Sequence, residues 1–258
     1  HAGQFYRVQN FETFSKRIEG SLLQTEAIPL LGIRNDATPD QLSFFIIEKG
    51  ASGEILARMQ VGDPIAVMGP TGAKTVIHET PSNILIIGNE MALMYLLSSG
   101  HELKKAGHHI YFIGIMDEEN RFALERMQEL SVEMKFVGSL EELNDMDFDS
   151  IEKVTVIGSV DLLKTMQSLR EKCFSPTAKF SASVYGPMQC MLKGVCAQCL
   201  QWQIDPITGK RTKAVYACSW QHQPMELIDI DNIDERLTQN RAQEILTRLW
   251  VEHISKTA

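Results

Sequence analysis

Four of the five cysteines of this chain lie in its last third, at a spacing that suits a metal centre. Cys190, Cys196, Cys199 and Cys218 follow the pattern C-x5-C-x2-C-x18-C. Three near thiolates and one distant thiolate hold plant-type 2Fe-2S clusters, although the first gap there is C-x4-C. Four thiolates also suit a tetrahedral zinc site, and Cys196 with Cys199 alone would suit a redox dithiol. The spacing leaves these chemistries open, together with cysteines that bind no metal.

The other candidate side chains give weaker signals. Cys173 ends a helical pattern and matches no ligand position, which predicts a free thiol that is buried or partly exposed. His222, four residues after Cys218, could serve only as an outer-shell donor or an exchange ligand. His108 and His109 precede an apolar strand pattern and are expected to be solvated turn residues. Among the seven histidines we find no Ser-His-Asp or Cys-His arrangement.

Composition excludes several classes of protein. The chain has 258 residues, of which 44% are hydrophobic and 22% charged, with a net charge of -8. An acidic chain without a basic stripe does not fit nucleic-acid binding, and no apolar run reaches the roughly 18 residues of a membrane span. Without a signal peptide we expect a cytoplasmic protein, where clustered cysteines are ligands and not disulfides. The start at His1 suggests a chain truncated at its N-terminus.

The first part of the chain, 1–78, predicts a small antiparallel barrel. Short strand patterns at GQFYRV, EAIPLLGI, QLSFFIIEKG and PIAVMGP are separated by polar turns. The segment GPTGAKT at 69–75 departs from a phosphate-binding P-loop, because Ala73 precedes Lys74 and the following TVI favours a strand. We interpret it as a turn that ends a barrel strand.

Residues 79–184 predict a doubly wound parallel sheet. Apolar strands at ILIIGN, HIYFIGI, MKFVGS, VTVIGS and KFSASVY alternate with the helical segments EMALMYLLSSGHELKK, ENRFALERMQEL and VDLLKTMQSLREK. A four-cysteine lobe follows over 185–229, with a hairpin whose turn is DPITGK. The tail 230–258 predicts an amphipathic helix, which we expect to dock on this chain or on a neighbouring module.

These motifs, taken in order, resemble one family. AGQF, EAIPL, GASGEILARMQVGD, GPTG, ILIIGN, VIGSVDLLKTM and SVYGPMQCMLKGVCAQC are similar to the electron-transfer subunit of the sulfide dehydrogenase and NADH-dependent ferredoxin:NADP oxidoreductase type. Its relatives include the dihydroorotate dehydrogenase electron-transfer subunit. The resemblance implies a ferredoxin-reductase plan, with FAD between barrel and nucleotide domain, and a 2Fe-2S cluster on the four cysteines. It also implies electron transfer between NAD(P)H and a partner flavoprotein, fused or separate.

The resemblance assigns cofactor contacts and also shows where this chain departs from the family. The flavin positions it implies are Pro29, Gly50, Ser52 and Gly69, and the nucleotide position is Gly88. Where the family has an arginine and a hydroxyl around the second flavin strand, this chain has Ala27 and Leu31. We therefore expect weakened flavin binding.

The nucleotide turn reads GNEMALM instead of a glycine-rich loop, with Glu90 at the start of a helix. A carboxylate at that place stabilises the helix and repels a phosphate, so NAD(P)H binding is doubtful. At the cluster motif, Met191 occupies the family's first ligand place and Cys190 lies one residue earlier. An electron-transfer module is the resulting interpretation. The alternative is a degenerate reductase fold that serves as a scaffold, with a structural zinc site.

Overall fold

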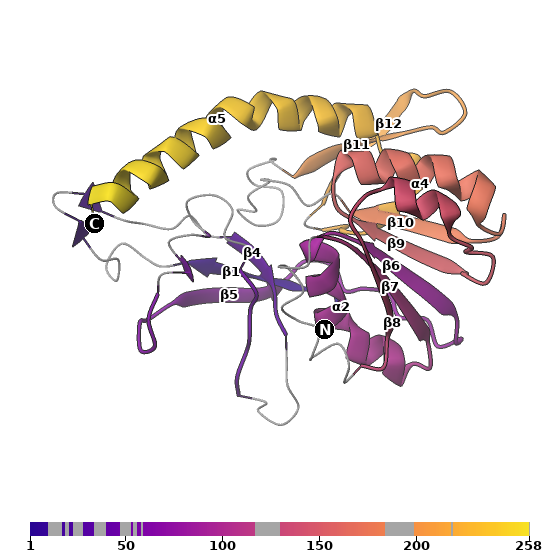
Figure 1. Cartoon of the computed structure of the whole chain (residues 1–258), viewed down its shortest axis with the longest axis horizontal. Helices are drawn as coiled ribbons and strands as arrows, with labels where there is room; N and C mark the ends of the chain where they lie inside the picture. The colour runs from indigo at the N-terminus through magenta and orange to yellow at the C-terminus, as the bar shows by residue number, and fades with distance from the viewer. Residues whose placement is uncertain are drawn as a thin grey trace.

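A computed structural model describes residues 1–9, 17–18, 21–22, 28–33, 40–46, 53, 56–57, 59–116, 130–183, 199–217 and 219–257. Within these residues there are two main sheets, a three-stranded sheet and a six-stranded sheet (Figure 1). Two smaller strand pairs accompany them.

The three-stranded sheet is antiparallel and has β1 (Phe5–Gln9) at its centre. Its outer strands are β4 (Ile28–Leu31) and β5 (Ala66–Thr71). A pair of two-residue strands, β2 (Arg17–Ile18) and β3 (Ser21–Leu22), lies apart from this sheet. The strands predicted at GQFYRV, EAIPLLGI and PIAVMGP are confirmed, whereas a closed barrel stays a prediction.

The six-stranded sheet follows the order β13-β10-β9-β6-β7-β8. Its five parallel strands are β6 (Asn83–Gly88), β7 (His109–Ile115), β8 (Glu133–Val137), β9 (Lys153–Ile157) and β10 (Lys179–Ser183). The short strand β13 (Gln223–Pro224) joins β10 in antiparallel orientation. From β6 the chain first adds β7 and β8 on one side of the sheet and then β9 and β10 on the other side. The topological switch point therefore lies between β6 and β9. The predicted doubly wound parallel sheet is confirmed.

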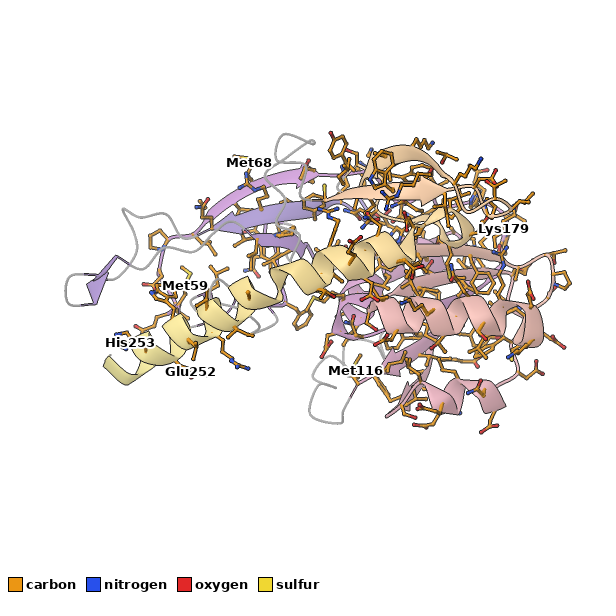
Figure 2. The ribbon with its side chains drawn as sticks, turned by 90° about the horizontal axis from the view of Figure 1, so that it is seen from above. Met59, Met68, Met116, Lys179, Glu252 and His253 are labelled. Carbon is orange, nitrogen blue, oxygen red and sulfur yellow. The ribbon has the colours of Figure 1, made fainter. Side chains whose placement is uncertain are left out.

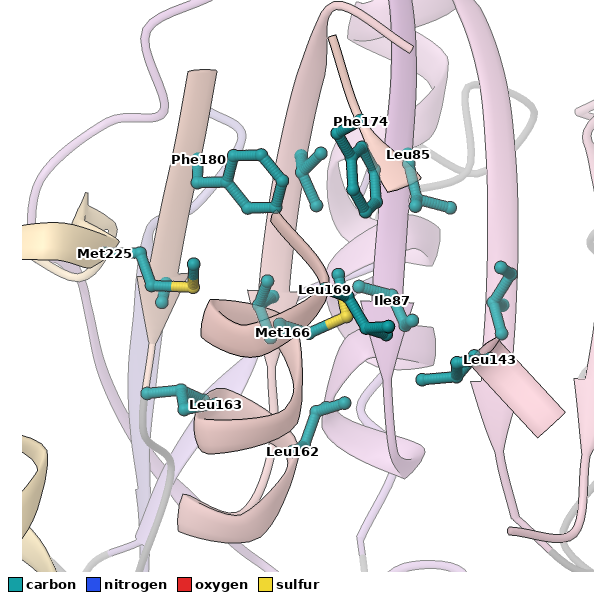
Figure 3. Close-up of a cluster of buried hydrophobic side chains, with 14 of the residues drawn as sticks. Leu85, Ile87, Leu143, Leu162, Leu163, Met166, Leu169, Phe174, Phe180 and Met225 are labelled. Atoms are coloured by element: carbon teal, nitrogen blue, oxygen red, sulfur yellow. The ribbon is translucent and has the colours of Figure 1, made fainter. Parts of the chain in front are cut away.

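Helices cover both faces of this sheet, and the alternation along β6 explains why. Ile84 and Ile86 pack with α2 (Glu90–Lys105), whereas Leu85 and Ile87 pack with α4 (Val160–Cys173) on the other face. Figure 3 shows the second of these clusters, which also receives Leu143 of η3 (Glu141–Asp145). Burial of each such side chain stabilises the fold by about 1.5–3 kcal/mol. Because both faces of these strands are buried, their sequences are continuous apolar runs.

The predicted hairpin is formed by β11 (Leu200–Ile204) and β12 (Arg211–Tyr216). At its turn the Asp205 carboxylate accepts hydrogen bonds from the amides of Ile207 and Thr208, and these bonds lower the pKa of Asp205. Gly209 adopts a φ of 67°, which favours glycine. The hairpin continues through β13 and η4 (Met225–Leu227) into the last helix.

The last helix, α5 (Ile230–Thr257), is 28 residues long and packs against α4 and β11. Its first turns are anchored by the buried side chains of Ile230 and Ile233. From there it extends towards the half of the molecule that holds β1, β4 and β5 (Figures 1 and 2). Along this extension the apolar side chains of Ile245, Leu246, Leu249 and Trp250 are exposed.

Two local predictions are wrong. The TVI segment at 75–77 forms no strand, because the Thr75 amide donates to the Ala2 carbonyl as the chain leaves the antiparallel sheet. His108 is buried at 3% exposure, and its Nδ1 accepts a hydrogen bond from the Ser82 amide. Its neighbour His109 is exposed as expected and contacts Glu133. Cys173 is a free, half-buried thiol, as predicted.

Candidate functional site

The carboxyl edge of the parallel sheet is the place to look for a ligand site. Strands β6, β9 and β10 end there at Gly88, Ile157 and Ser183. In open α/β sheets, ligands bind outside the carboxyl ends of the strands at the switch point. The side chains and backbone groups at this edge therefore decide what the fold can hold.

Gly88 is tightly enclosed where β6 passes β9. A Cβ atom at this position would overlap the carbonyl oxygen of Ile157 and also press against Ala92. The glycine is thus required by the close approach of two neighbouring strands. This packing explains Gly88 without a bound nucleotide.

The amide groups at the start of α2 are already engaged in hydrogen bonds. The side chain of Asn89 caps the helix by accepting a hydrogen bond from the Met91 amide at 3.0 Å. The amides of Ala92 and Leu93 donate to the Asn89 carbonyl, and the Asn89 amide donates to Ile157. A pyrophosphate site at a helix N-terminus needs amide groups that point at the ligand. This geometry supports the interpretation of a packed turn.

The flavin positions that the structure describes all lie in the antiparallel sheet. Pro29 lies in β4 opposite Arg7 of β1, and Gly69 lies in β5 against Tyr6. Gly69 has a φ of 149°, a backbone conformation that residues other than glycine rarely adopt. Leu31 is buried at 5% exposure in the apolar cluster that includes Phe5. Gly50, Ser52 and Ala27 lie outside the described residues.

Of the four candidate metal ligands, Cys199 is described. It is buried at 4% exposure directly before β11, and its carbonyl accepts a hydrogen bond from the Ala217 amide at 3.0 Å. Cys190, Cys196 and Cys218 lie outside the described residues. Within the part of the chain that the structure describes, there is no group of three or more His, Cys, Asp or Glu side chains that could hold a metal ion.

A buried polar cluster around His222 was not predicted from the sequence. Ser183 Oγ donates to the Gln221 carbonyl and lies 2.8 Å from His222 Nδ1. The His222 ring meets the Tyr95 ring edge-on, with 4.6 Å between centroids. Tyr95 donates in turn to Thr75 Oγ1 at 3.2 Å. This cluster joins the end of β10, the α2 helix and the segment that follows β5.

Burial shifts the pKa values of this cluster. It lowers the pKa of His222 to about 4, so the imidazole is neutral at pH 7. Burial also raises the pKa of Tyr95, and the hydrogen bond with Thr75 offsets part of that change. Two buried polar atoms of the cluster, His222 Nε2 and Gln221 Oε1, have no hydrogen-bond partner in the described part of the chain. The only sequence signal for this arrangement was the position of His222 after Cys218.

A second buried polar group lies on the inner face of the hairpin. Gln203 donates to Gln223 at 2.9 Å, and Gln223 donates to the side-chain oxygen of Gln201 at 2.6 Å. This chain of amides leaves Gln201 Nε2 buried and without a hydrogen-bond partner among the described residues. Because side chains alternate along a strand, Gln201 and Gln203 lie on one face of β11. Cys199, two residues before Gln201, continues the same alternation.

Taken together, the two sheets and their order define a ferredoxin reductase-like fold. The NADH-dependent reduced ferredoxin-NADP oxidoreductase, a protein of flavin-based electron bifurcation, superposes with a TM-score of 0.70. The match covers 97% of this chain and 87% of that chain at 20% identity. A flavohemoglobin from Malassezia yamatoensis, solved with bound FAD and heme, superposes with a TM-score of 0.51 over 72% of this chain and 51% of that chain, at 16% identity.

Comparison of sequences gives a relative whose function is not described. An uncharacterized protein of Rickettsia prowazekii (strain Madrid E) is 28% identical over 243 residues, or 94% of this chain. The chain spans 28% of the length of that relative. No family model matches the chain. Among the described helices, none combines the length and apolarity needed to cross a membrane.

Proposed function

We propose that this chain is an electron-transfer module of an oxidoreductase and holds a 2Fe-2S cluster at its cysteine segment. The observation that supports this most is the fold, which matches the NADH-dependent reduced ferredoxin-NADP oxidoreductase over 97% of the chain. When bound, such a cluster accepts and releases single electrons. We propose Cys196, Cys199 and Cys218 as ligands, with Cys190 as the fourth by its spacing.

The burial of Cys199 supports a metal centre at the cysteine segment. The thiol of Cys199 is buried, and a ligand thiolate shielded from water keeps its metal better than an exposed one. The buried Nε2 atoms of Gln201 and His222 have no hydrogen-bond partner among the residues that the structure describes. Buried polar groups without partners cost about 1–3 kcal/mol, and contacts with a cluster would remove that cost.

We propose that this chain binds flavin and nucleotide weakly. FAD could contact the backbone around Pro29, Gly50, Ser52 and Gly69, but the buried Leu31 offers it no hydroxyl. The occupied amides of the α2 N-terminus disfavour NAD(P)H at Gly88. We therefore propose that electrons are exchanged with a flavoprotein or oxidoreductase module, in the same polypeptide or as a separate subunit.

The same α2 geometry favours a second function, a reductase fold that serves as a scaffold. In that case the cysteines would hold a structural zinc ion, and the chain would have no redox activity of its own. Metal content separates the two proposals.

The test is anaerobic purification from cells grown with ample iron, followed by absorption spectroscopy and by analysis of iron, labile sulfide and zinc. We expect a brown protein with about two irons and two sulfides per chain. A Cys196→Ser and Cys199→Ser double variant should lose both, whereas Cys173→Ser, outside the segment, should keep both. Stoichiometric zinc without sulfide would overturn the redox proposal and support the scaffold.

A further inference from the structure

Arg7 carries a positive charge on one face of the antiparallel sheet. It lies in the central strand β1, directly opposite Pro29 of β4 and Met68 of β5 (Figure 1). The pairing of β1 with β4 is regular, so side chains alternate along β1 and Arg7 shares its face with Phe5. The other strand residues on this face are uncharged, namely Phe5, Gln9, Pro29, Leu31, Ala66, Met68 and Thr71.

This face of the sheet is turned towards the parallel-sheet half of the molecule. Phe5 and Leu31 are buried in the same apolar cluster as Ile84 of β6. The opposite face packs separately, because Tyr6 and Val8 belong to a different cluster. Arg7 therefore lies on the side of the sheet where the two halves meet.

The cover that the parallel-sheet half provides ends close to Arg7. Phe5 is 5% exposed, whereas Arg7 and Pro29 are half-buried and Met68 is 53% exposed. The Nε atom of Arg7 is itself buried. The stem of this side chain thus lies against the sheet, and its charged end reaches the surface, as is usual for long cationic side chains. An uncovered area of sheet with one cation on it suits an anionic ligand.

The proposed function brings such an anion, FAD, to the backbone around Pro29 and Gly69. Gly69 directly follows Met68 in β5. The family's arginine stands two residues before Pro29, where this chain has Ala27. Diagonal positions on paired strands are about 7–8 Å apart, which a long side chain can span. From its place opposite Pro29, Arg7 can therefore supply the missing charge.

We propose that Arg7 binds the diphosphate of FAD and replaces the arginine that the family carries at the position of Ala27. This inference rests on the proposed function, which brings FAD to this sheet. A guanidinium group has five N–H donors, so contacts within the protein leave donors for a ligand. Its planar fork can hold a phosphate through two hydrogen bonds. The site stays weaker than that of the family, because Leu31 offers no hydroxyl.

Equilibrium dialysis of the purified chain, freed of bound flavin, measures the dissociation constant of FAD. Arg7→Gln should raise it roughly tenfold to a hundredfold, the usual effect of losing hydrogen bonds to a charged group. Arg7→Lys should give an intermediate value, since lysine keeps the charge and loses the fork. Lys210→Gln, at the exposed turn of the hairpin, removes the same charge and should leave the constant unchanged.

Riboflavin separates recognition of phosphate from damage to the site. It carries no phosphate, so Arg7→Gln and the unaltered chain should not differ towards it, and thermal unfolding should show that both are folded. If Arg7→Gln does not fold, Arg7→Lys decides, and undiminished FAD affinity in that variant would overturn the inference.

Equal FAD affinity of Arg7→Gln and the unaltered chain would also overturn it, as would a lack of FAD binding by the unaltered chain. These results leave the electron-transfer proposal intact, because analysis of iron, sulfide and zinc tests that proposal separately.

Discussion

At the scale of single residues, close packing determines Gly88. Its hydrogen atoms face the Ile157 carbonyl across β6 and β9, which form the centre of the parallel sheet. A methyl group there would have to separate two central strands. A residue that the family resemblance assigns to nucleotide binding is therefore needed by the sheet itself.

We predict that Gly88→Ala destabilises the protein by about 3 kcal/mol, since overpacking of a rigid core costs about 1–3 kcal/mol and sometimes more. Urea unfolding followed by circular dichroism would measure this. Gly138→Ala is the matched control, because the nearest atom to its added Cβ is 3.7 Å away and belongs to the flexible Glu142 side chain. Equal stability of the two variants would show that β6 and β9 separate easily.

His108 makes stability depend on pH. Burial and the positive charge of Lys153 lower its pKa, while the Ser82 amide donates to its bare Nδ1. The backbone of His78 and that of Ser82 act in the opposite direction and offset part of this shift in the pKa of His108. In the unfolded chain histidine binds a proton near pH 6.5, so the unfolded state gains protons first as the pH falls. Stability contributed by neutral His108 is therefore complete above pH 6.5 and declines below it.

We predict that His108→Asn weakens this decline. The Asn side-chain oxygen can still accept the hydrogen bond from Ser82, but it does not titrate. Thermal unfolding of the metal-free protein between pH 5 and pH 7.5 would measure the slope, with His109→Asn as the exposed control. Some decline should remain, because the lowered pKa of His222 acts in the same direction. An unchanged slope in His108→Asn would contradict the prediction.

These histidines also show what the sequence could not supply. His108 and His109 are adjacent and look alike in the sequence, yet one is buried and the other exposed. The difference depends on Ser82, 26 residues away, whose amide needs an acceptor inside the protein. Likewise Ser183, Tyr95 and Thr75 become partners of His222 only through packing of distant segments. The spacing of residues along the chain does not predict such contacts.

At the scale of elements, α2 depends on its cap. Asn89 satisfies the amides at the helix start through its side chain and its carbonyl. We predict that Asn89→Ala destabilises the protein by about 1 kcal/mol, the usual cost of losing an N-cap. The melting temperature should fall by about 2–4 °C for a chain of this size.

Ser159 provides a comparison on the opposite face, because its hydroxyl accepts a hydrogen bond from the Leu162 amide at the start of α4. Ser159→Ala should cost a similar amount. Asn89→Gly should cost less than Asn89→Ala, since glycine is tolerated at N-caps. If Asn89→Ala left the free energy of unfolding unchanged, water would replace the cap at no cost in stability.

The sequence predicted the parallel sheet well for a physical reason. Its strands are covered on both faces, so their apolar runs are continuous and stand out from the amphipathic helices between them. The antiparallel sheet was harder. Residues 41–46 carry the apolar side chains of a strand, yet among the described pairs Ser43 forms one isolated bridge with Ile33. Side-chain pattern predicts burial, whereas strand pairing depends on the backbone of a distant partner.

At the scale of the whole molecule, α5 runs from the parallel sheet towards the antiparallel half (Figure 2). The sequence predicted this helix and its apolar side chains. These apolar side chains differ in burial, because Ile233 is 2% exposed and Leu246 is 67% exposed. A helix pattern cannot show how far the supporting surface extends. The predicted docking of this helix is confirmed for its first turns, and docking of the exposed part on a neighbouring module stays a prediction.

The last prediction concerns NAD(P)H as a reductant of the proposed electron-transfer module. A ferredoxin reductase-like fold suggests NAD(P)H at the carboxyl edge of the parallel sheet, but here the α2 amides are occupied and Glu90 lies in the first turn. A carboxylate within about 4 Å of a phosphate costs roughly 1 kcal/mol even in water, and more when partly buried. We predict no reduction of the isolated chain by micromolar NADH or NADPH in stopped-flow absorption measurements, although dithionite reduces it. Glu90→Gln should not restore the reaction, because the amides stay engaged with Asn89. Rapid reduction of the unaltered chain by either nucleotide would contradict the prediction and assign it an ordinary reductase activity.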